Sequence, residues 1–354
     1  MPFEVIDTLD SLANLIEFRS SAVYELIISI RTLLKPARWH ESFVERVKAA
    51  LSPALMEELV DLYQNFSDGG LYFEFPVDYP DHDDVPGFFR YMHSLSDADF
   101  MFYLLGRTIS REELSGLLYQ PKSADLLRAG IIAVGEHYEW YGHNLEPIVK
   151  DIGAFKQRLI AAWEAYWDAF LQHELPNFQA QWIVGMQEKQ SIFAREGGRG
   201  LLEKVTGKVQ LPPEVPPGVP YTSITFIPVC LLPSRVYQFF GYGNLTILFD
   251  PQFTEERRAE VQNAKKDAIS ILKAMDDETR LQILRLIAQH GSRMHGKNIA
   301  EKLGISASAV SRHLALLKDG GLIAEDPRKN LITYRFQKEV LTSLVDKLLD
   351  YLYS

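Results

Sequence analysis

The sequence predicts a mainly α-helical fold with a small amount of β structure. Three observations support this prediction: helical periodicity of apolar residues through the first 210 positions, β-branched and aromatic runs after a proline-rich connector, and helical periodicity again near the C-terminus. The chain has 354 residues, more than one domain usually contains, so more than one hydrophobic core is expected. We therefore expect a helical N-terminal domain over 1–210, a β region over 211–253 and a C-terminal domain over 254–354.

The N-terminal domain is predicted to consist of helices with recognisable start signals. Two serines at 20–21 precede an apolar face over 23–34, and serine followed by proline at 52–53 is typical of an N-cap with proline at the first helical position. Further helices are predicted over 96–105, 110–118, 122–138, 145–170 and 178–195. The prolines of segment 71–89 predict an ordered loop with a short strand there.

The β region follows a stiff connector. Five of the eleven residues from 211 to 221 are prolines, which favours an extended chain. Segments 222–229, 235–240 and 245–249 are rich in β-branched and aromatic residues, and the glycines at 241–244 indicate a turn. We expect a small antiparallel meander that packs on the helical body.

Composition excludes several classes of protein. Cys230 is the single cysteine, so the chain can form no intrachain disulfide, and this usage is typical of a reducing cytosol. No run of about 18 apolar residues occurs, and the N-terminus lacks a basic segment. We expect a cytoplasmic protein that neither spans a membrane nor is exported.

The sequence contains no recognisable catalytic or cofactor motif. The glycines at 241 and 243 form a Gly-x-Gly without a following helix, and neither a Walker loop nor a Gly-x-Ser-x-Gly motif occurs. The acidic run at 81–84, which includes His82, lacks the glycine and the spacing of a calcium loop, so we expect it to be solvated. We therefore expect no enzyme, cofactor or metal site.

The charge is distributed unevenly. Residues 264–354 carry 15 Lys or Arg and 11 Asp or Glu, so this segment has a net charge of +4, whereas the rest carries −14 within the total of −10. An acidic body joined to a basic segment is expected when one small module approaches phosphates and the rest does not.

Signals for a winged helix-turn-helix occupy this basic segment. After helices near 265–275 and 277–290, residues 298–303 form a short helix, Gly304 permits the tight turn and Ser306 can cap a second helix over 307–318. A glycine pair at 320–321 ends that helix, and a β-hairpin with a polar tip follows, which we interpret as the wing.

The faces of the second helix predict its role in binding DNA. Apolar residues at 310, 314 and 317 must face the core, so the small and polar residues between them point outward, where a helix can enter the major groove. Arg312 is the best candidate for a guanine contact, whereas His313 could either touch phosphate or pack beside Leu314. The candidate DNA-binding residues are Lys297, Ser306, Ser308, Ser311, Arg312, His313, Lys318, Arg328 and Lys329.

Three stretches resemble the arsenic-repressor-like (ArsR) winged-helix regulators: 277–284 (DETRLQIL), 298–317 (NIAEKLGISASAVSRHLALL) and 321–323 (GLI). The likeness covers about a quarter of the chain. It implies a bacterial homodimer that reads an inverted-repeat operator and whose first and last helices, near 269–275 and 340–352, form the interface. The residues implied at that interface are Ile269, Leu272, Leu341, Leu344, Val345, Leu348 and Leu352.

The N-terminal body resembles an uncharacterised domain that some actinobacterial and Gram-positive ArsR-type proteins carry, through the stretches 16–18 (IEF) and 24–26 (YEL). Metal-sensing members of the family carry cysteine pairs where this chain has 291–296 (GSRMHG), so a thiolate metal sensor is not expected. Aromatic residues at helical spacing are more often core than ligand site. If the body holds an effector pocket, the candidate residues are Tyr72, Phe73, Phe75, Trp163 and Trp167.

We interpret the chain as a homodimeric regulator that binds double-stranded DNA and represses transcription, with an N-terminal sensor for a small-molecule effector or a protein. Two alternatives remain open at this point. One is an enzyme fused to a DNA-binding module, and the other is a module whose winged helix binds a protein partner.

Overall fold

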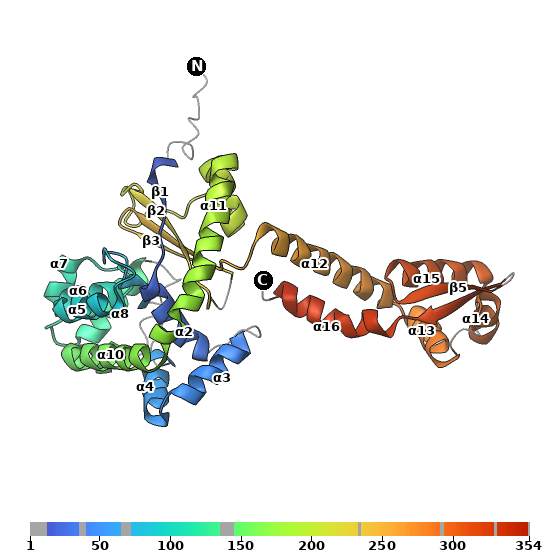
Figure 1. Cartoon of the computed structure of the whole chain (residues 1–354), viewed down its shortest axis with the longest axis horizontal. Coiled ribbons are helices and arrows are strands. Elements are labelled where there is room, and N and C mark those ends of the chain that lie inside the picture. Colours follow the sequence, from blue (N-terminus) through green and yellow to red (C-terminus); the bar gives the residue numbers. More distant parts are fainter. Residues whose placement is uncertain are drawn as a thin grey trace, which may run out of the picture. The chain divides into compact units, whose positions relative to one another are not determined.

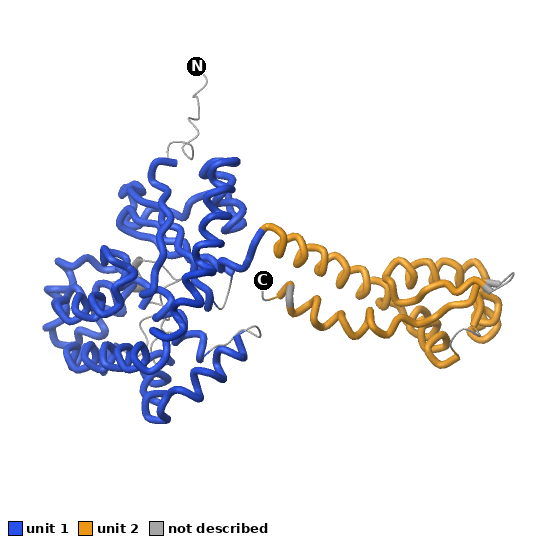
Figure 2. The backbone as a smooth tube through the Cα atoms, viewed as in Figure 1, with its two compact units in different colours: residues 1–254 blue, residues 255–354 orange. Residues whose placement is uncertain are grey.

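The computed structural model describes residues 13–34, 40–64, 72–134, 145–232, 235–290, 294–328 and 331–352. The chain forms two compact units, Met1–Thr254 and Glu255–Ser354, here called the N-terminal unit and the C-terminal unit (Figure 2). Helices dominate both, and strands make up a small part (Figure 1). The predicted fold class, mainly α with small β, is confirmed.

The N-terminal unit is built mostly from helices joined by short connections. Its α-helices are α2 (Ala22–Leu34), α3 (Glu41–Ala50), α4 (Pro53–Gln64), α5 (Val85–Ser94), α6 (Asp97–Leu104), α7 (Arg111–Leu117), α8 (Ser123–Val134), α9 (Leu145–Lys150), α10 (Ile152–Tyr166) and α11 (Gln172–Thr206). A 3-10 turn, η4 (Tyr72–Glu74), precedes α5, and a π-helical segment, η6 (Trp167–Leu171), joins α10 to α11. Helix ends follow ordinary capping chemistry: the Ser110 hydroxyl accepts a hydrogen bond from the Glu113 amide, and the Ser110 amide donates to the Glu113 carboxylate.

The described part of segment 71–89 differs from the prediction because it contains no strand. It forms η4, a series of turns and the start of α5. The Asp84 carboxylate accepts the Gly87 amide at 2.8 Å, and Pro86 falls in the first turn of α5, where proline removes no helical hydrogen bond. The prediction that residues 81–84 are solvated is also wrong for His82. Its side chain is buried, with Nε2 3.0 Å from the Pro76 carbonyl oxygen.

The sheet of the N-terminal unit is mixed, so the predicted antiparallel meander is wrong. Its strands are β1 (Ile16–Phe18), β2 (Ser223–Pro228), β3 (Val236–Gly241) and β4 (Asn244–Phe249), in the order β1-β2-β4-β3. Strands β3 and β4 form the expected hairpin, but β2 runs parallel to both β4 and β1. Strands β2 and β4 are buried along almost their whole length, as parallel strands covered on both faces usually are.

Helices cover both faces of this sheet. One face, with Ile227, Phe239 and Leu248, joins the large core formed by the helices from α2 to α11. The other face, with Ile224, Phe226 and Ile247, packs under the C-terminal part of α11, which lies along the sheet in Figure 1. The helical body and the sheet are therefore one folded unit.

Helix α11 also holds the last residues of the N-terminal unit. A Cβ atom at Gly185 would lie 2.7 Å from the Pro251 Cα atom, so only glycine permits this approach. One turn further on, the buried Lys189 side chain donates to the Phe253 carbonyl oxygen at 3.3 Å. The chain is thus fastened to α11 at the point where it leaves the N-terminal unit.

The C-terminal unit has its own core and follows the predicted order of elements. It contains α12 (Glu255–Met275), α13 (Glu278–His290), α14 (Gly296–Leu303), α15 (Ala307–Asp319), β5 (Ile323–Arg328), β6 (Leu331–Phe336) and α16 (Lys338–Leu352). Strands β5 and β6 form an antiparallel hairpin directly after α15. Among the described helices, none combines the length and the apolar character needed to cross a membrane.

Candidate nucleic-acid interface

Helices α14 and α15 form a helix-turn-helix whose turn is set by local capping. Gly304 ends α14 with a φ of 67°, a left-handed conformation that glycine adopts without strain. The Ser306 hydroxyl then accepts the Ala309 amide at 3.2 Å and so caps α15. Both signals were visible in the sequence.

One face of α15 is anchored in the core of the C-terminal unit. Val310, Leu314 and Leu317 are buried there, as their spacing predicted. At the C-terminal end of α15, a Cβ atom at Gly320 would lie 2.6 Å from the Ala274 Cβ atom of α12. Gly320 is therefore needed for close packing of these two helices and not only for ending α15.

The opposite face of α15 carries exposed residues able to form hydrogen bonds. Ser308, Ser311 and Arg312 lie on this face, Ser306 is exposed at its start, and Lys297 is exposed in the first turn of α14. One accessible helical surface therefore carries a guanidinium and several hydroxyl groups. These groups can donate hydrogen bonds to base edges and phosphates.

Two of the predicted contacts lie in different surroundings. Lys318 is exposed at the end of α15, but its Nζ atom lies 3.0 Å from Glu325 Oε2, so its charge is already paired on the protein surface. Arg328 ends strand β5, but its side chain and the whole of Lys329 lie outside the described residues.

His313 does not lie on the exposed face of α15. Its side chain is 11% exposed, and its Nδ1 atom is directed to Asp277 Oδ1 at 3.8 Å. The sequence left open whether His313 meets phosphate or packs beside Leu314, and the geometry favours packing, because position 313 lies next to the buried Leu314 and Val310. Sequence reasoning had no signal for the proximity of Asp277, which lies on another element.

Helices α12 and α16 pack together within the chain, and this divides the predicted interface residues into two groups. Leu344 is buried in the core of the C-terminal unit, and Leu341 and Leu348 pack against that core, so these three serve the fold of their own chain. The remaining predicted residues are large apolar side chains with 41–68% exposure: Ile269, Leu272, Val345 and Leu352.

The aromatic residues considered for an effector pocket pack as core. Tyr72, Phe75 and Trp163 are fully buried, with ring centroids 5.6 Å apart for Tyr72 and Trp163 and 6.2 Å apart for Phe75 and Trp163. Phe73 is buried against strand β3, and Trp167 is half-buried at the edge of the same core. Their placement agrees with the interpretation as core residues, which their helical spacing favours.

A groove of about 850 Å³ lies elsewhere in the N-terminal unit, between strand β3 and the segment that follows α11. Val236, Gln238 and Phe240 of β3 form one wall, and residues 208–213 form the other. No local sequence pattern predicts this groove, because it depends on how the proline-rich segment passes the edge strand β3.

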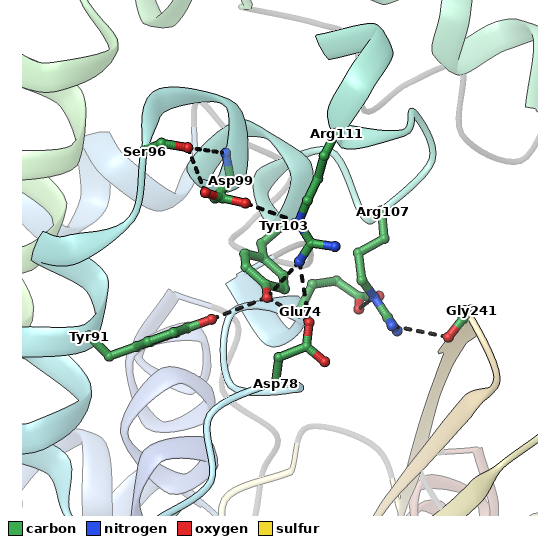
Figure 3. Close-up of polar contacts among 9 residues, drawn as sticks. All are labelled: Glu74, Asp78, Tyr91, Ser96, Asp99, Tyr103, Arg107, Arg111 and Gly241. Atoms are coloured by element: carbon green, nitrogen blue, oxygen red, sulfur yellow. Dashed lines mark hydrogen bonds and ion pairs between the residues drawn. The ribbon is translucent and has the colours of Figure 1, made fainter. Parts of the chain in front are cut away.

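A network of ionisable side chains connects the turn that follows η4 with α5, α6 and α7 at the surface of the N-terminal unit (Figure 3). The Tyr103 hydroxyl donates to Asp78 at 2.6 Å and accepts from Tyr91 and from Arg111, whose Nε atom donates to Asp99 at 3.0 Å. Burial and the bond to Asp78 raise the pKa of Tyr103 well above its usual value. The charged groups of this network bind one another, as in a structural ion-pair network.

Beside this network lies a buried ion pair. The Arg107 Nε atom donates to Glu74 at 2.7 Å, and Nη1 donates to the Gly241 carbonyl oxygen at 3.0 Å (Figure 3). Both side chains are less than one tenth exposed. The pair joins η4, the end of α6 and the β3–β4 hairpin.

The described residues hold no group of three or more His, Cys, Asp or Glu side chains placed to bind a metal ion.

Comparison with known proteins places the helix-turn-helix in a family. The family model of bacterial regulatory proteins of the arsR family matches residues 277–325. The HTH-type transcriptional regulator YgaV of Escherichia coli (strain K12) is 32% identical over 87 residues, which are 25% of this chain and 87% of that protein. The transcriptional repressor SdpR of Bacillus subtilis (strain 168) is 31% identical over 83 residues, 23% of this chain and 90% of SdpR.

A third relative, the transcriptional activator HlyU of Vibrio cholerae, is 30% identical over 89 residues, 25% of this chain and 81% of HlyU. A solved structure of reduced HlyU covers 27% of this chain and 96% of its own, with a TM-score of 0.21 and 32% identity. These relatives are at least 30% identical to the chain over the matched segments, which make up most of their own length. The chain therefore belongs to the arsR family of bacterial regulatory proteins, through the helix-turn-helix of its C-terminal unit.

Proposed function

We propose that the protein is a homodimeric repressor that binds a specific duplex DNA site through α15. The observation that carries this proposal is the division of α15 into two faces. Val310, Leu314 and Leu317 are buried, whereas Ser308, Ser311 and Arg312 are exposed on the opposite side. A helix fixed to its domain by one face and presenting a guanidinium and hydroxyl groups on the other is suited to the major groove.

The exposed apolar side chains of α12 and α16 support a dimer. Ile269 and Leu272 are 41% and 43% exposed, and Val345 and Leu352 are 60% and 68% exposed. Their spacing along both helices places them at helical repeats, so one stripe of apolar surface can pack against the same stripe of a second copy. Such a dimer would present two α15 helices to an inverted repeat.

The sign of regulation is proposed as repression. The printed names of the relatives include one repressor, SdpR, and one activator, HlyU, so kinship alone supports neither sign over the other. Repression is the simpler outcome, because a dimer that occupies its operator excludes other proteins from that DNA without any further contact.

We assign the N-terminal unit the role of the sensor, with the groove beside β3 as the site of a small-molecule effector. The groove's volume of about 850 Å³ lies within the range of small-molecule sites. Val236 and Phe240 offer apolar contacts, and Gln238 and Lys208 offer polar ones. Gln238→Trp places a bulky ring on one wall of the groove and should weaken the response of DNA binding to the effector without changing DNA binding in its absence.

The proposed DNA binding is tested with Arg312→Ala and a matched control. Duplex fragments selected from genomic DNA by the intact protein would be titrated by fluorescence anisotropy at several salt concentrations. We expect affinity to fall steeply with salt, and Arg312→Ala to weaken binding by about 5- to 150-fold, the effect of losing one bidentate base contact of about 1–3 kcal/mol. Arg199→Ala removes the same charge from an exposed position on α11 and should leave affinity unchanged. Equal affinities for both variants would refute the proposal.

A further inference from the structure

His313 occupies an unusual position for a residue in the middle of α15. Its neighbours Ser311 and Arg312 are exposed, but the His313 side chain points inward and is 11% exposed. Its Nδ1 atom is buried without a hydrogen-bond partner among the described residues. The nearest charged group is the Asp277 carboxylate, with Oδ1 at 3.8 Å, which is beyond direct hydrogen-bond distance.

Asp277 is itself held in place by the turn between α12 and α13. Its Oδ1 atom accepts the Arg280 amide at 2.8 Å and so caps α13, and this bond lowers the pKa of Asp277. The Arg280 side chain donates to the carbonyl oxygens of Ala274 at 2.8 Å and Lys273 at 3.1 Å, which lie at the end of α12. An ionised carboxylate is therefore fixed at a junction of two helices and faces the imidazole of a third.

We infer that His313 is a positioning residue, which sets the orientation of α15 on the α12–α13 turn through Asp277 and does not itself touch DNA. This inference rests on the proposed DNA binding and deepens it. The carboxylate attracts a ring N–H of the neutral imidazole and attracts the protonated ring more strongly, so in either state it favours one orientation of the side chain.

A second contact makes this orientation matter. At its C-terminal end α15 is held by the close approach of Gly320 to Ala274 of α12. His313 lies two turns before Gly320, so these two contacts restrain the rotation and tilt of α15 in addition to its core residues Val310, Leu314 and Leu317. The position of the Arg312 side chain depends directly on that of His313, because the two residues are adjacent in the chain.

The alternative is a direct phosphate contact by His313, and salt dependence separates the two. Each lost contact between a positively charged side chain and a phosphate makes the fall of log affinity with log salt concentration less steep by about 1, whereas loss of a positioning residue leaves that slope unchanged. His313→Leu replaces the imidazole with an apolar side chain of similar size and removes both ring nitrogens, so thermal stability should be retained or raised.

The experiment uses the full chain and the selected duplex. We expect His313→Leu to weaken binding about three- to tenfold at an unchanged salt slope and without loss of thermal stability. His313→Gln, whose amide can still direct an N–H group to Asp277, should restore affinity to within about twofold. Asp277→Asn should weaken binding in the wild-type background and have no further effect with His313→Leu, because the two groups then act as one unit.

Several results would overturn the inference: a salt slope lowered by about 1, unchanged affinity in His313→Leu, no rescue by glutamine, or losses that simply add in the double variant. Arg312→Ala distinguishes these from failure of the proposed function. If Arg312→Ala and His313→Leu both leave binding unchanged, DNA recognition by α15 is wrong. If only Arg312→Ala weakens binding, DNA recognition stands and the positioning role is wrong.

Discussion

Glu25 illustrates how a single side chain can hold distant segments together. Its carboxylate, fully buried in α2, accepts the Trp182 ring N–H at 3.0 Å and the amides of Cys230 and Leu231 at 2.8 and 3.0 Å. These donors fix the segment that carries the chain from β2 toward β3. Burial nevertheless outweighs these bonds and raises the pKa of Glu25 from 4.5 to about 7.

This raised pKa predicts a pH-dependent contribution to stability. Between pH 4.5 and 7 the folded state binds the Glu25 proton more tightly than the unfolded state, so this group's contribution to the free energy of unfolding falls as pH rises and is constant above pH 7. The total change is about 3 kcal/mol. Glu25→Gln does not titrate, so its stability relative to wild type should increase over this range.

The appropriate measure is the difference in free energy of unfolding between the variant and wild type, because His40 and His82 change the stability of both proteins with pH in the opposite direction. Burial lowers the pKa of each to about 4, so their contribution is lost as pH falls from about 6.5 to 4. Urea unfolding followed by tryptophan fluorescence at several pH values gives the difference. A difference that does not vary with pH would contradict the assignment to Glu25.

Among the elements, the η4 turn, the end of α6 and the β3–β4 hairpin depend on the buried pair of Glu74 and Arg107. Removing one partner of a buried ion pair leaves the other charge without compensation, at a cost of about 3–5 kcal/mol. Glu74→Gln should therefore lower the urea midpoint of the N-terminal unit substantially.

The matched control for this pair is the double variant Glu74→Gln with Arg107→Met, which removes the uncompensated charge and should recover part of the lost stability. Far-UV circular dichroism during urea unfolding measures both variants. A wild-type midpoint for Glu74→Gln would mean that the Arg107 guanidinium is solvated in solution.

Elements differ in how far their sequence predicted them. The helix-turn-helix was predictable because its signals, such as Gly304 and Ser306, act within a few residues of the structure they determine. The mixed sheet was not, since β1 and β2 pair across about two hundred residues and no local pattern records such a partner. The inward direction of His313 was undecided because it lies at the boundary between the buried and exposed faces of α15.

At the scale of the whole molecule, the exposed stripe on α12 and α16 predicts the oligomeric state. Val345→Asp places a carboxylate in the proposed interface, where burial of an unpaired charge is unfavourable. We expect sedimentation equilibrium to show a dimer for wild type and a monomer for this variant at micromolar concentration, with DNA affinity reduced at least about tenfold because a monomer contacts one half-site. Gln282→Glu adds the same charge at an exposed position of α13 and should remain dimeric.

The pairing of β1 with β2 also constrains how the chain is synthesised and folded. Strand β1 emerges from the ribosome long before residues 223–249, yet the sheet to which it belongs can form only after those residues have been synthesised. Until then the apolar residues of the sheet side of α11 remain uncovered, so nascent chains of intermediate length need protection from association. A protein truncated after residue 210 would keep helices α2 to α11 but lack three of the four strands of the N-terminal sheet, and so would share this exposed state permanently.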